Sequence, residues 1–149
     1  MTGVKLTLAL LVAATASGMG GTAVAKPSGA GRESVVLTFR LHYEMQCGWP
    51  GAGPLAIDFP RQVKLPRSFP AGSVTVDGKA TVASRPTAAG VVQVTLPKRP
   101  QLMCDAIGPG TLVVRFGAAA AIGNPASAGK YPIELVRGTT RFRVFLTVG

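Results

Sequence analysis

Five side chains that could bind a soft metal ion lie at or beside the two cysteines of the chain. His42, Met45 and Cys47 fall within the segment HYEMQC, and Met103 and Cys104 fall within LMC. Imidazole, thioether and thiolate groups are a ligand set that suits Cu(I). These residues therefore allow a small extracytoplasmic copper carrier, or an enzyme built around His42, Met45 and the cysteines.

The cysteines have a second interpretation, which would remove both thiolates. An even number of cysteines in an exported protein indicates a disulfide first. The wide separation of Cys47 and Cys104 excludes a C-x-x-C redox motif. Closing so long a loop contributes roughly 4 kcal/mol in the chain-entropy model. We predict a Cys47–Cys104 disulfide covered by Met45 and Met103, and we keep the copper site as the alternative.

Carboxylates and hydroxyls form no catalytic pattern in the sequence. The chain has 6 Asp and Glu residues, of which Glu44 and Asp105 lie near the cysteines. A paired-carboxylate glycosidase places its acids in a deep cleft, and a small domain has little room for one. No serine lies in a nucleophile elbow, and no glycine-rich phosphate loop leads into a helix. We predict a protein that is not an enzyme and needs no cofactor.

The charge is strongly basic, with 16 Lys and Arg residues against 6 acidic ones. The basic residues are dispersed, and aromatic residues make up only 6% of the chain, too few for a base-stacking platform. We therefore expect no nucleic acid and predict as partner an unknown protein or an anionic envelope polymer. Because Trp and Arg are enriched at binding hot spots, the candidate binding residues are Trp49, Arg61, Arg67 and Arg99.

The first 25 residues have the pattern of a secretory signal peptide. Lys5 precedes an apolar segment, residues 6–16, that is too short to span a bilayer. Ala23 and Ala25 then occupy the small-residue positions of a cleavage site. We predict cleavage after Ala25, a polar leader over residues 26–33, and one domain over residues 34–149. The product would be secreted or held at the cell surface, without stable membrane insertion.

Short strands dominate the rest of the chain. Apolar and polar residues alternate over residues 34–43, 55–59, 90–97 and 111–116, and the segments around RGTT indicate a final hairpin. Asp77-Gly78 is the preferred pair for a type I′ hairpin turn. Apart from a possible helical turn at AAAAI, no segment after the signal peptide has helical periodicity. Seven or eight strands in one domain predict an all-β fold, a single immunoglobulin-like β-sandwich with one disulfide.

Three segments resemble a module of bacterial extracellular and cell-surface proteins. They are GSVTVDGKA (residues 72–80), VVQVTLP (91–97) and VVRFGAAAAIGNPASAGKYPIELV (113–136). The chain is also similar, over about residues 54–149, to small secreted proteins of high-GC bacteria that carry one such unit. The resemblance implies an immunoglobulin-like β-sandwich at the cell exterior and supplies no catalytic residues. We therefore predict a non-enzymatic structural or binding module.

Overall fold

The computed structural model describes residues 19–45, 52–97 and 108–149. This part of the chain forms nine strands and one turn of 3-10 helix, η1 (Ala118–Ala120). No helix within it is long and apolar enough to cross a membrane. The strands are β1 (Met19–Lys26), β2 (Val36–Met45), β3 (Gly53–Asp58), β4 (Val74–Val76), β5 (Lys79–Ala80), β6 (Val91–Leu96), β7 (Gly108–Phe116), β8 (Gly129–Arg137) and β9 (Thr140–Val148).

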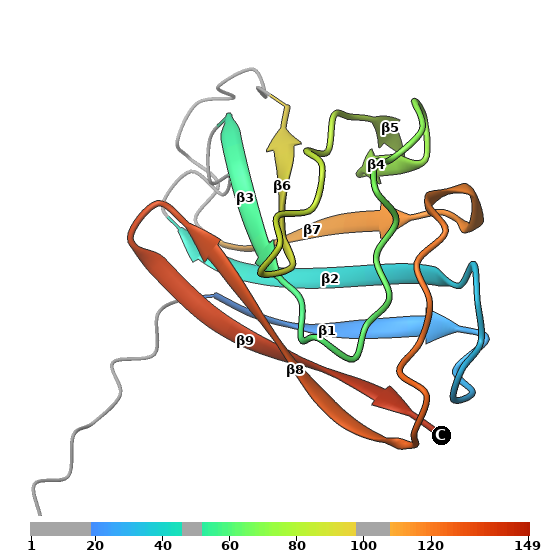
Figure 1. The fold of residues 1–149 in the computed structure, drawn as a ribbon. Coiled ribbons are helices and arrows are strands. Elements are labelled where there is room, and N and C mark those ends of the chain that lie inside the picture. Colours follow the sequence, from blue (N-terminus) through green and yellow to red (C-terminus); the bar gives the residue numbers. More distant parts are fainter. Residues whose placement is uncertain (1–18, 46–51, 98–107) are drawn as a thin grey trace, which may run out of the picture.

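All nine strands belong to one sheet, in the order β5-β4-β7-β2-β1-β9-β8-β3-β6. The sheet is curled, so that β3, β6 and β8 cross in front of β1, β2 and β7 (Figure 1). The segment that follows β5 links the two ends of the sheet through backbone hydrogen bonds. Thr81 N–H donates to Val74 O on β4 at 3.0 Å, and Thr95 N–H on β6 donates to Val82 O at 2.9 Å. The all-β prediction is confirmed. The strand number is nine rather than seven or eight, and one continuous sheet supplies both facing layers.

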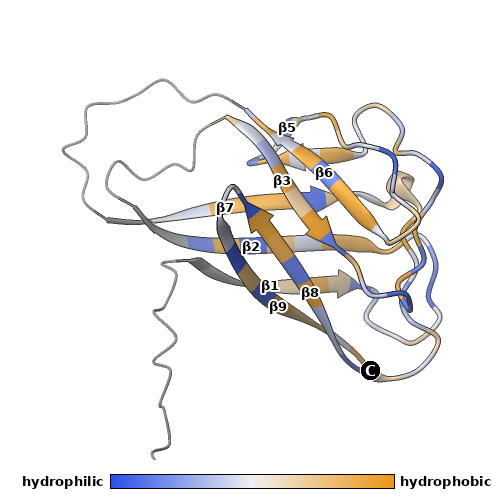
Figure 2. Cartoon of the chain, turned by 60° about the vertical axis from the view of Figure 1, so that its left-hand side comes forward, coloured by the Kyte–Doolittle hydropathy of each residue, from blue (hydrophilic) through white to orange (hydrophobic). Residues whose placement is uncertain are grey.

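Strict alternation along the strands builds the core. In β2, Leu37, Phe39 and Leu41 are fully buried, whereas Arg40 and His42 face solvent. Hydrophobic and hydrophilic residues alternate in the same way along β6 and β8 (Figure 2). Because side chains alternate between the two faces of a strand, this pattern fixes which face of the sheet turns inward. The alternation expected within residues 34–43 is confirmed for residues 35–42, whose side chains the structure describes.

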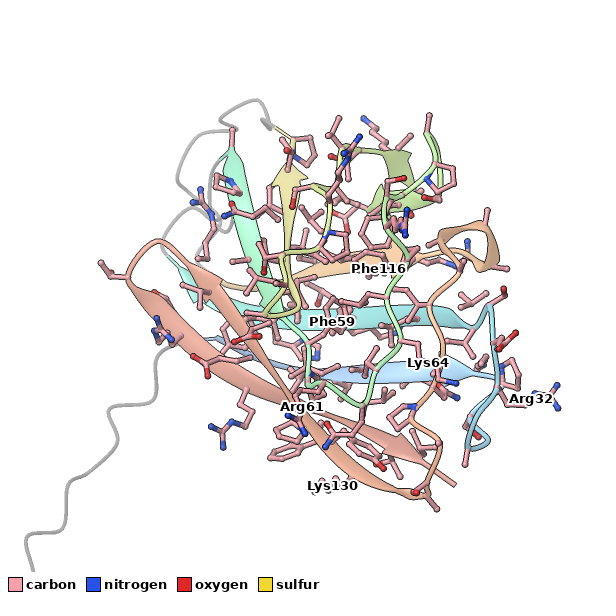
Figure 3. The ribbon with its side chains drawn as sticks, in the orientation of Figure 1. Arg32, Phe59, Arg61, Lys64, Phe116 and Lys130 are labelled. Carbon is pink, nitrogen blue, oxygen red and sulfur yellow. The ribbon has the colours of Figure 1, made fainter. Side chains whose placement is uncertain are left out.

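An aromatic cluster lies at the centre of the core. The ring centroids of Phe39, Phe59 and Phe116 are 6.1 Å apart in each pair, with edge-to-face orientations. Phe69 packs against Phe116 at 5.4 Å. Figure 3 places Phe59 and Phe116 inside the body of the molecule, whereas Arg32 points away from it. The cluster therefore links β2 and β7 to the chain that follows β3.

The local turn signals of the sequence are confirmed. Asp77 and Gly78 have positive φ angles of 48° and 81°, as a type I′ turn requires, and they join β4 to β5. The Asp77 carboxylate also accepts the backbone N–H of Val113 at 2.9 Å, which ties this hairpin to β7. Within the segment AAAAI, Ala118–Ala120 form the helical turn η1, and the RGTT segment lies at the β8–β9 hairpin.

Strand β1 is formed by residues that the sequence assigns to the signal peptide. It pairs with β2 in antiparallel fashion along its whole length, and with β9 in parallel fashion at Ala23 and Leu146. Ala23 and Ala25 are buried, with only 6% and 2% of their surface exposed. Cleavage after Ala25 stays a prediction. It would remove every residue of β1 except Lys26 from the middle of the sheet.

The segment 121–131 fastens the N-terminal leader to the domain. Asn124 is only 1% exposed, and its Nδ2 donates to Pro27 O at 2.9 Å and to Gly29 O at 2.8 Å. Its backbone N–H donates to Arg32 O at 2.8 Å. This segment therefore acts as a structural connector, and the role of Asn124 is to hold the chain between β1 and β2.

We expect Asn124→Ala to destabilise the protein by about 2–3 kcal/mol. The substitution removes two side-chain hydrogen bonds, each worth about 1 kcal/mol, and leaves two carbonyl groups without that partner. Urea unfolding followed by circular dichroism measures the change. Ser127→Ala is the matched control, because its side chain is exposed and should cost less than about 0.5 kcal/mol. Equal midpoints for the two variants would show that Asn124 does not hold the leader.

Candidate functional site: a basic face of strands β1, β2 and β7

Strands β1, β2 and β7 are neighbours in the sheet, and their outward side chains share one solvent-facing surface. Both pairings, β1 with β2 and β2 with β7, are antiparallel and continuous, so the register gives each residue its neighbours. All the outward side chains described on these strands are exposed or half-buried, and none is acidic. This surface, called the basic face, comprises Thr22, Val24, Lys26, Val36, Thr38, Arg40, His42, Thr111, Val113 and Arg115.

Two arginines lie close together on the basic face. Arg115 is directly opposite Thr38, and Arg40 is two residues further along the same strand as Thr38. Diagonal neighbours in an antiparallel pair are separated by about 7–8 Å. The two guanidinium groups can therefore reach the same bound molecule, and Thr38 is a neighbour of both arginines.

An open depression of about 370 Å³ lies on this face. Of its six lining residues, two are valines and three are cationic, so the lining combines apolar and positively charged side chains. A depression this open gives an extended molecule access from several directions. The lining residues are Val24, Lys26, Val36, Thr38, Arg40 and Arg115.

The cations around the depression are available to an external anion. Arg141 and Glu134 form an ion pair on the β8–β9 hairpin, with 2.6 Å between Arg141 Nη1 and Glu134 Oε1. Neither of its residues lines the depression. No described carboxylate pairs with Lys26, Arg40 or Arg115. Their charges therefore remain uncompensated by the described part of the protein.

His42, one of the predicted copper ligands, lies towards one end of the basic face. Its Nδ1 is 3.4 Å from Thr111 Oγ1 across the β2–β7 pair. The side chain of Met45, and Cys47, Met103 and Cys104 as a whole, lie outside the described residues. Within the described ranges, no three His, Cys, Asp or Glu side chains are grouped as a metal site. The Cys47–Cys104 disulfide and the copper alternative therefore both remain predictions.

The four binding candidates taken from the sequence are not brought to this face. Arg61 and Arg67 are exposed in the irregular segment between β3 and β4, and neither lines the depression. Trp49 and Arg99 lie outside the described residues. Arg61 and Arg67 are therefore exposed cations outside the depression, which makes them suitable control positions for it.

Sequence reasoning missed the basic face because its cations are far apart along the chain. Lys26 was assigned to a polar leader, and Arg115 lies in a segment recognised only as a strand. The outward face of residues 34–43 was the one available signal, since it placed Arg40 beside Thr38. The pairing of β2 with both β1 and β7 brings the three cations together, and alternation within single strands does not reveal that pairing.

Comparison with known proteins gives a likeness of fold alone. No protein-family model matches the sequence, and no curated protein matches it. Among solved structures, the chain is similar to the 35 kDa C-terminal fragment of the major pilin GBS80 of Streptococcus agalactiae, with 8% sequence identity and a TM-score of 0.46. The match covers 85% of this chain and 53% of the pilin fragment, so the chain spans about half of that fragment's length. A function for this chain can therefore be inferred only from its own surface, the basic face.

Proposed function

We propose that this protein is a non-enzymatic binding module of the bacterial cell exterior, and that its basic face binds an anionic envelope polymer. The proposal includes export by an N-terminal signal, an immunoglobulin-like classification of the β-fold and the Cys47–Cys104 disulfide. It requires that removal of the signal leave β1 in place, because Thr22 and Val24 belong to the basic face. The observation that carries the binding role is the set of cations Lys26, Arg40 and Arg115 around one open depression, without a described carboxylate partner.

Two features support a polymer rather than a small metabolite. The depression is open to solvent, and its cations come from three adjacent strands, so that a chain can cross the sheet and meet each in turn. Paired strands also hold these side chains on a rigid framework, which reduces the entropy lost on binding. Charge complementarity steers such an encounter and makes it sensitive to salt.

The double variant R40A/R115A should lose about 10- to 100-fold in affinity for anionic polymers, because both cations line the depression. Binding of the full chain to poly(glycerol phosphate) and to polygalacturonate, measured by isothermal titration calorimetry at low salt, tests this expectation. The wild-type protein should bind at least one of the two polymers, and the affinity should fall as salt is added.

The matched control is R61A/R67A, which removes the same number of positive charges from exposed positions outside the depression. We expect less than about a threefold loss for this variant, because salt screens exposed charges that do not contact the ligand. An equal loss in both double variants would assign binding to net charge and overturn the proposed site. Failure of the wild-type protein to bind either polymer would overturn the proposed function.

A further inference from the structure

We infer that the basic face selects phosphodiester polymers of the cell envelope, such as chains of glycerol or sugar phosphates, over carboxylate polymers. This inference rests on the proposed function and specifies the chemical class of its ligand. The observation that carries it is the placement of threonine hydroxyls next to both arginines of the face, through the strand register.

Each arginine has a threonine directly across at least one strand pair. Arg115 is opposite Thr38 on β2 and opposite Thr75 on β4. Arg40 is opposite Thr22 on β1. Directly opposite residues have Cβ atoms about 4.5–5.5 Å apart, so a hydroxyl and a guanidinium group can contact one anion together.

This donor set matches a tetrahedral phosphodiester better than a planar carboxylate. The guanidinium fork of an arginine satisfies both oxygens of a carboxylate with two parallel hydrogen bonds. A phosphodiester presents the same two charged oxygens and two further ester oxygens around a tetrahedral centre. The acceptor directions of a carboxylate lie in one plane, which a bidentate guanidinium shares, whereas those of a phosphodiester spread around its tetrahedral centre. A neighbouring threonine hydroxyl outside that plane therefore donates more readily to the phosphodiester.

Repetition of the arginine and threonine pair favours a polymer with repeated phosphates. The pair Arg115 and Thr38 spans β7 and β2, and the pair Arg40 and Thr22 spans β2 and β1. Thr38 and Arg40 occupy consecutive outward positions of β2, so the two pairs are adjacent. Lys26 adds a third positive charge at the β1 side of the depression. Since separate cations can meet successive phosphates, a chain of phosphodiesters gains more from this face than an isolated phosphate does.

The described part of the face does not favour nucleic acid. Its outward side chains include no Phe, Tyr or Trp on which a base could stack, although base stacking carries much of the affinity for single strands. The neighbouring exposed ring on β9, Phe145, is in contact with the Lys130 ammonium, which lies 4.6 Å from its centroid. A polymer without bases therefore fits the surface better.

The carboxylate of Asp77, at the turn beside β7, accepts the backbone N–H of Val113, a residue of the face. Asp77 does not line the depression. Its charge thus belongs to the hairpin that supports β7, and the phosphate site lies around Arg115, Thr38 and Arg40.

Isothermal titration calorimetry of the full chain with three probes tests the inference: poly(glycerol phosphate), polygalacturonate of equal charge number, and oligo(dT) with the same number of phosphates. We expect poly(glycerol phosphate) to bind at least about tenfold more tightly than either of the other two, a difference of about 1.4 kcal/mol. Comparable binding of polygalacturonate would overturn phosphate selectivity while leaving the proposed function intact. Tighter binding of oligo(dT) would overturn the choice of a polymer without bases.

Substitution of the hydroxyl separates selectivity from simple attraction. Thr38→Val keeps the shape and β-branching of the side chain and removes the hydroxyl. It should weaken binding of poly(glycerol phosphate) about three- to tenfold and change binding of polygalacturonate less than twofold. Thr139→Val, at the exposed β8–β9 turn, is the control and should leave both affinities unchanged. An equal effect of Thr38→Val on both polymers, or no effect on either, would contradict a role for the hydroxyl.

Discussion

A chain that begins at Lys26 will be far less stable than a chain that begins at Met19. The shorter chain lacks β1 except for its last residue, so β2 and β9 each lose a partner strand. Each lost backbone hydrogen bond costs about 0.5–1.5 kcal/mol net, and the core beside Phe39 and Leu41 is opened to water. The sum is on the order of 5 kcal/mol or more, which is comparable with the total stability of an ordinary domain.

Thermal and urea unfolding of the two chains, both produced without the first 18 residues, measures this difference. The chain starting at Met19 serves as the reference, because it keeps the whole of β1. We expect the chain starting at Lys26 to be unfolded, or to have a midpoint lowered by more than 10 °C. Identical unfolding curves would mean that β1 adds nothing to the fold and that cleavage after Ala25 leaves the domain complete.

The position of β1 also changes which processing site is compatible with the folded domain. Ala14 and Ala16 repeat the small-residue spacing of Ala23 and Ala25, and they precede β1. Cleavage after Ala16 would leave the strand intact. N-terminal sequencing of exported protein distinguishes a chain that starts Ser-Gly-Met-Gly from one that starts Lys-Pro-Ser-Gly.

The second large effect is expected in the aromatic cluster. Phe116→Ala should destabilise the protein by about 4 kcal/mol, because the ring is fully buried and contacts three other phenylalanines. Part of the loss comes from the edge-to-face contacts with Phe39 and Phe59, which exceed simple burial by about 0.5–1.5 kcal/mol per pair. The free energy of unfolding, obtained from urea titration, is the measurement.

Phe145→Ala is the matched control for Phe116→Ala. Its ring is 44% exposed on β9 and contacts the Lys130 ammonium, so the substitution should cost less than about 1 kcal/mol. Comparable losses in the two variants would show that the cluster around Phe116 is not the centre of the core.

Local sequence signals identified most of the individual elements. The Asp77-Gly78 turn, the alternation in residues 34–43 and the β8–β9 hairpin all depend on contacts between neighbours in sequence, and each is present. Strand β1 was missed because small residues such as Ala23 and Ala25 suit both a signal peptidase and the inside of a tightly packed sheet. A single curled sheet was missed because closure depends on long-range pairing, which no periodicity encodes.

The candidate site likewise depends on long-range strand pairing, which the sequence does not reveal. Exposed residues such as Arg61 and Arg67 could be chosen by type alone, but nothing in a linear sequence placed Arg115 beside Thr38. That neighbourhood arises from the β2–β7 register. A site assembled from adjacent strands is therefore visible only after the strand order is known.

The parallel pairing of Ala23 with Leu146 joins β1, the first strand of the described residues, to β9, the last one. The sheet cannot be completed until almost the whole polypeptide has been delivered, because β9 is the final partner of β1. Pairs between residues so distant in sequence form slowly, since the loop between them must close first. Under the proposed export, the chain would therefore cross the membrane unfolded and complete its fold only when β1 and β9 are present in the same compartment.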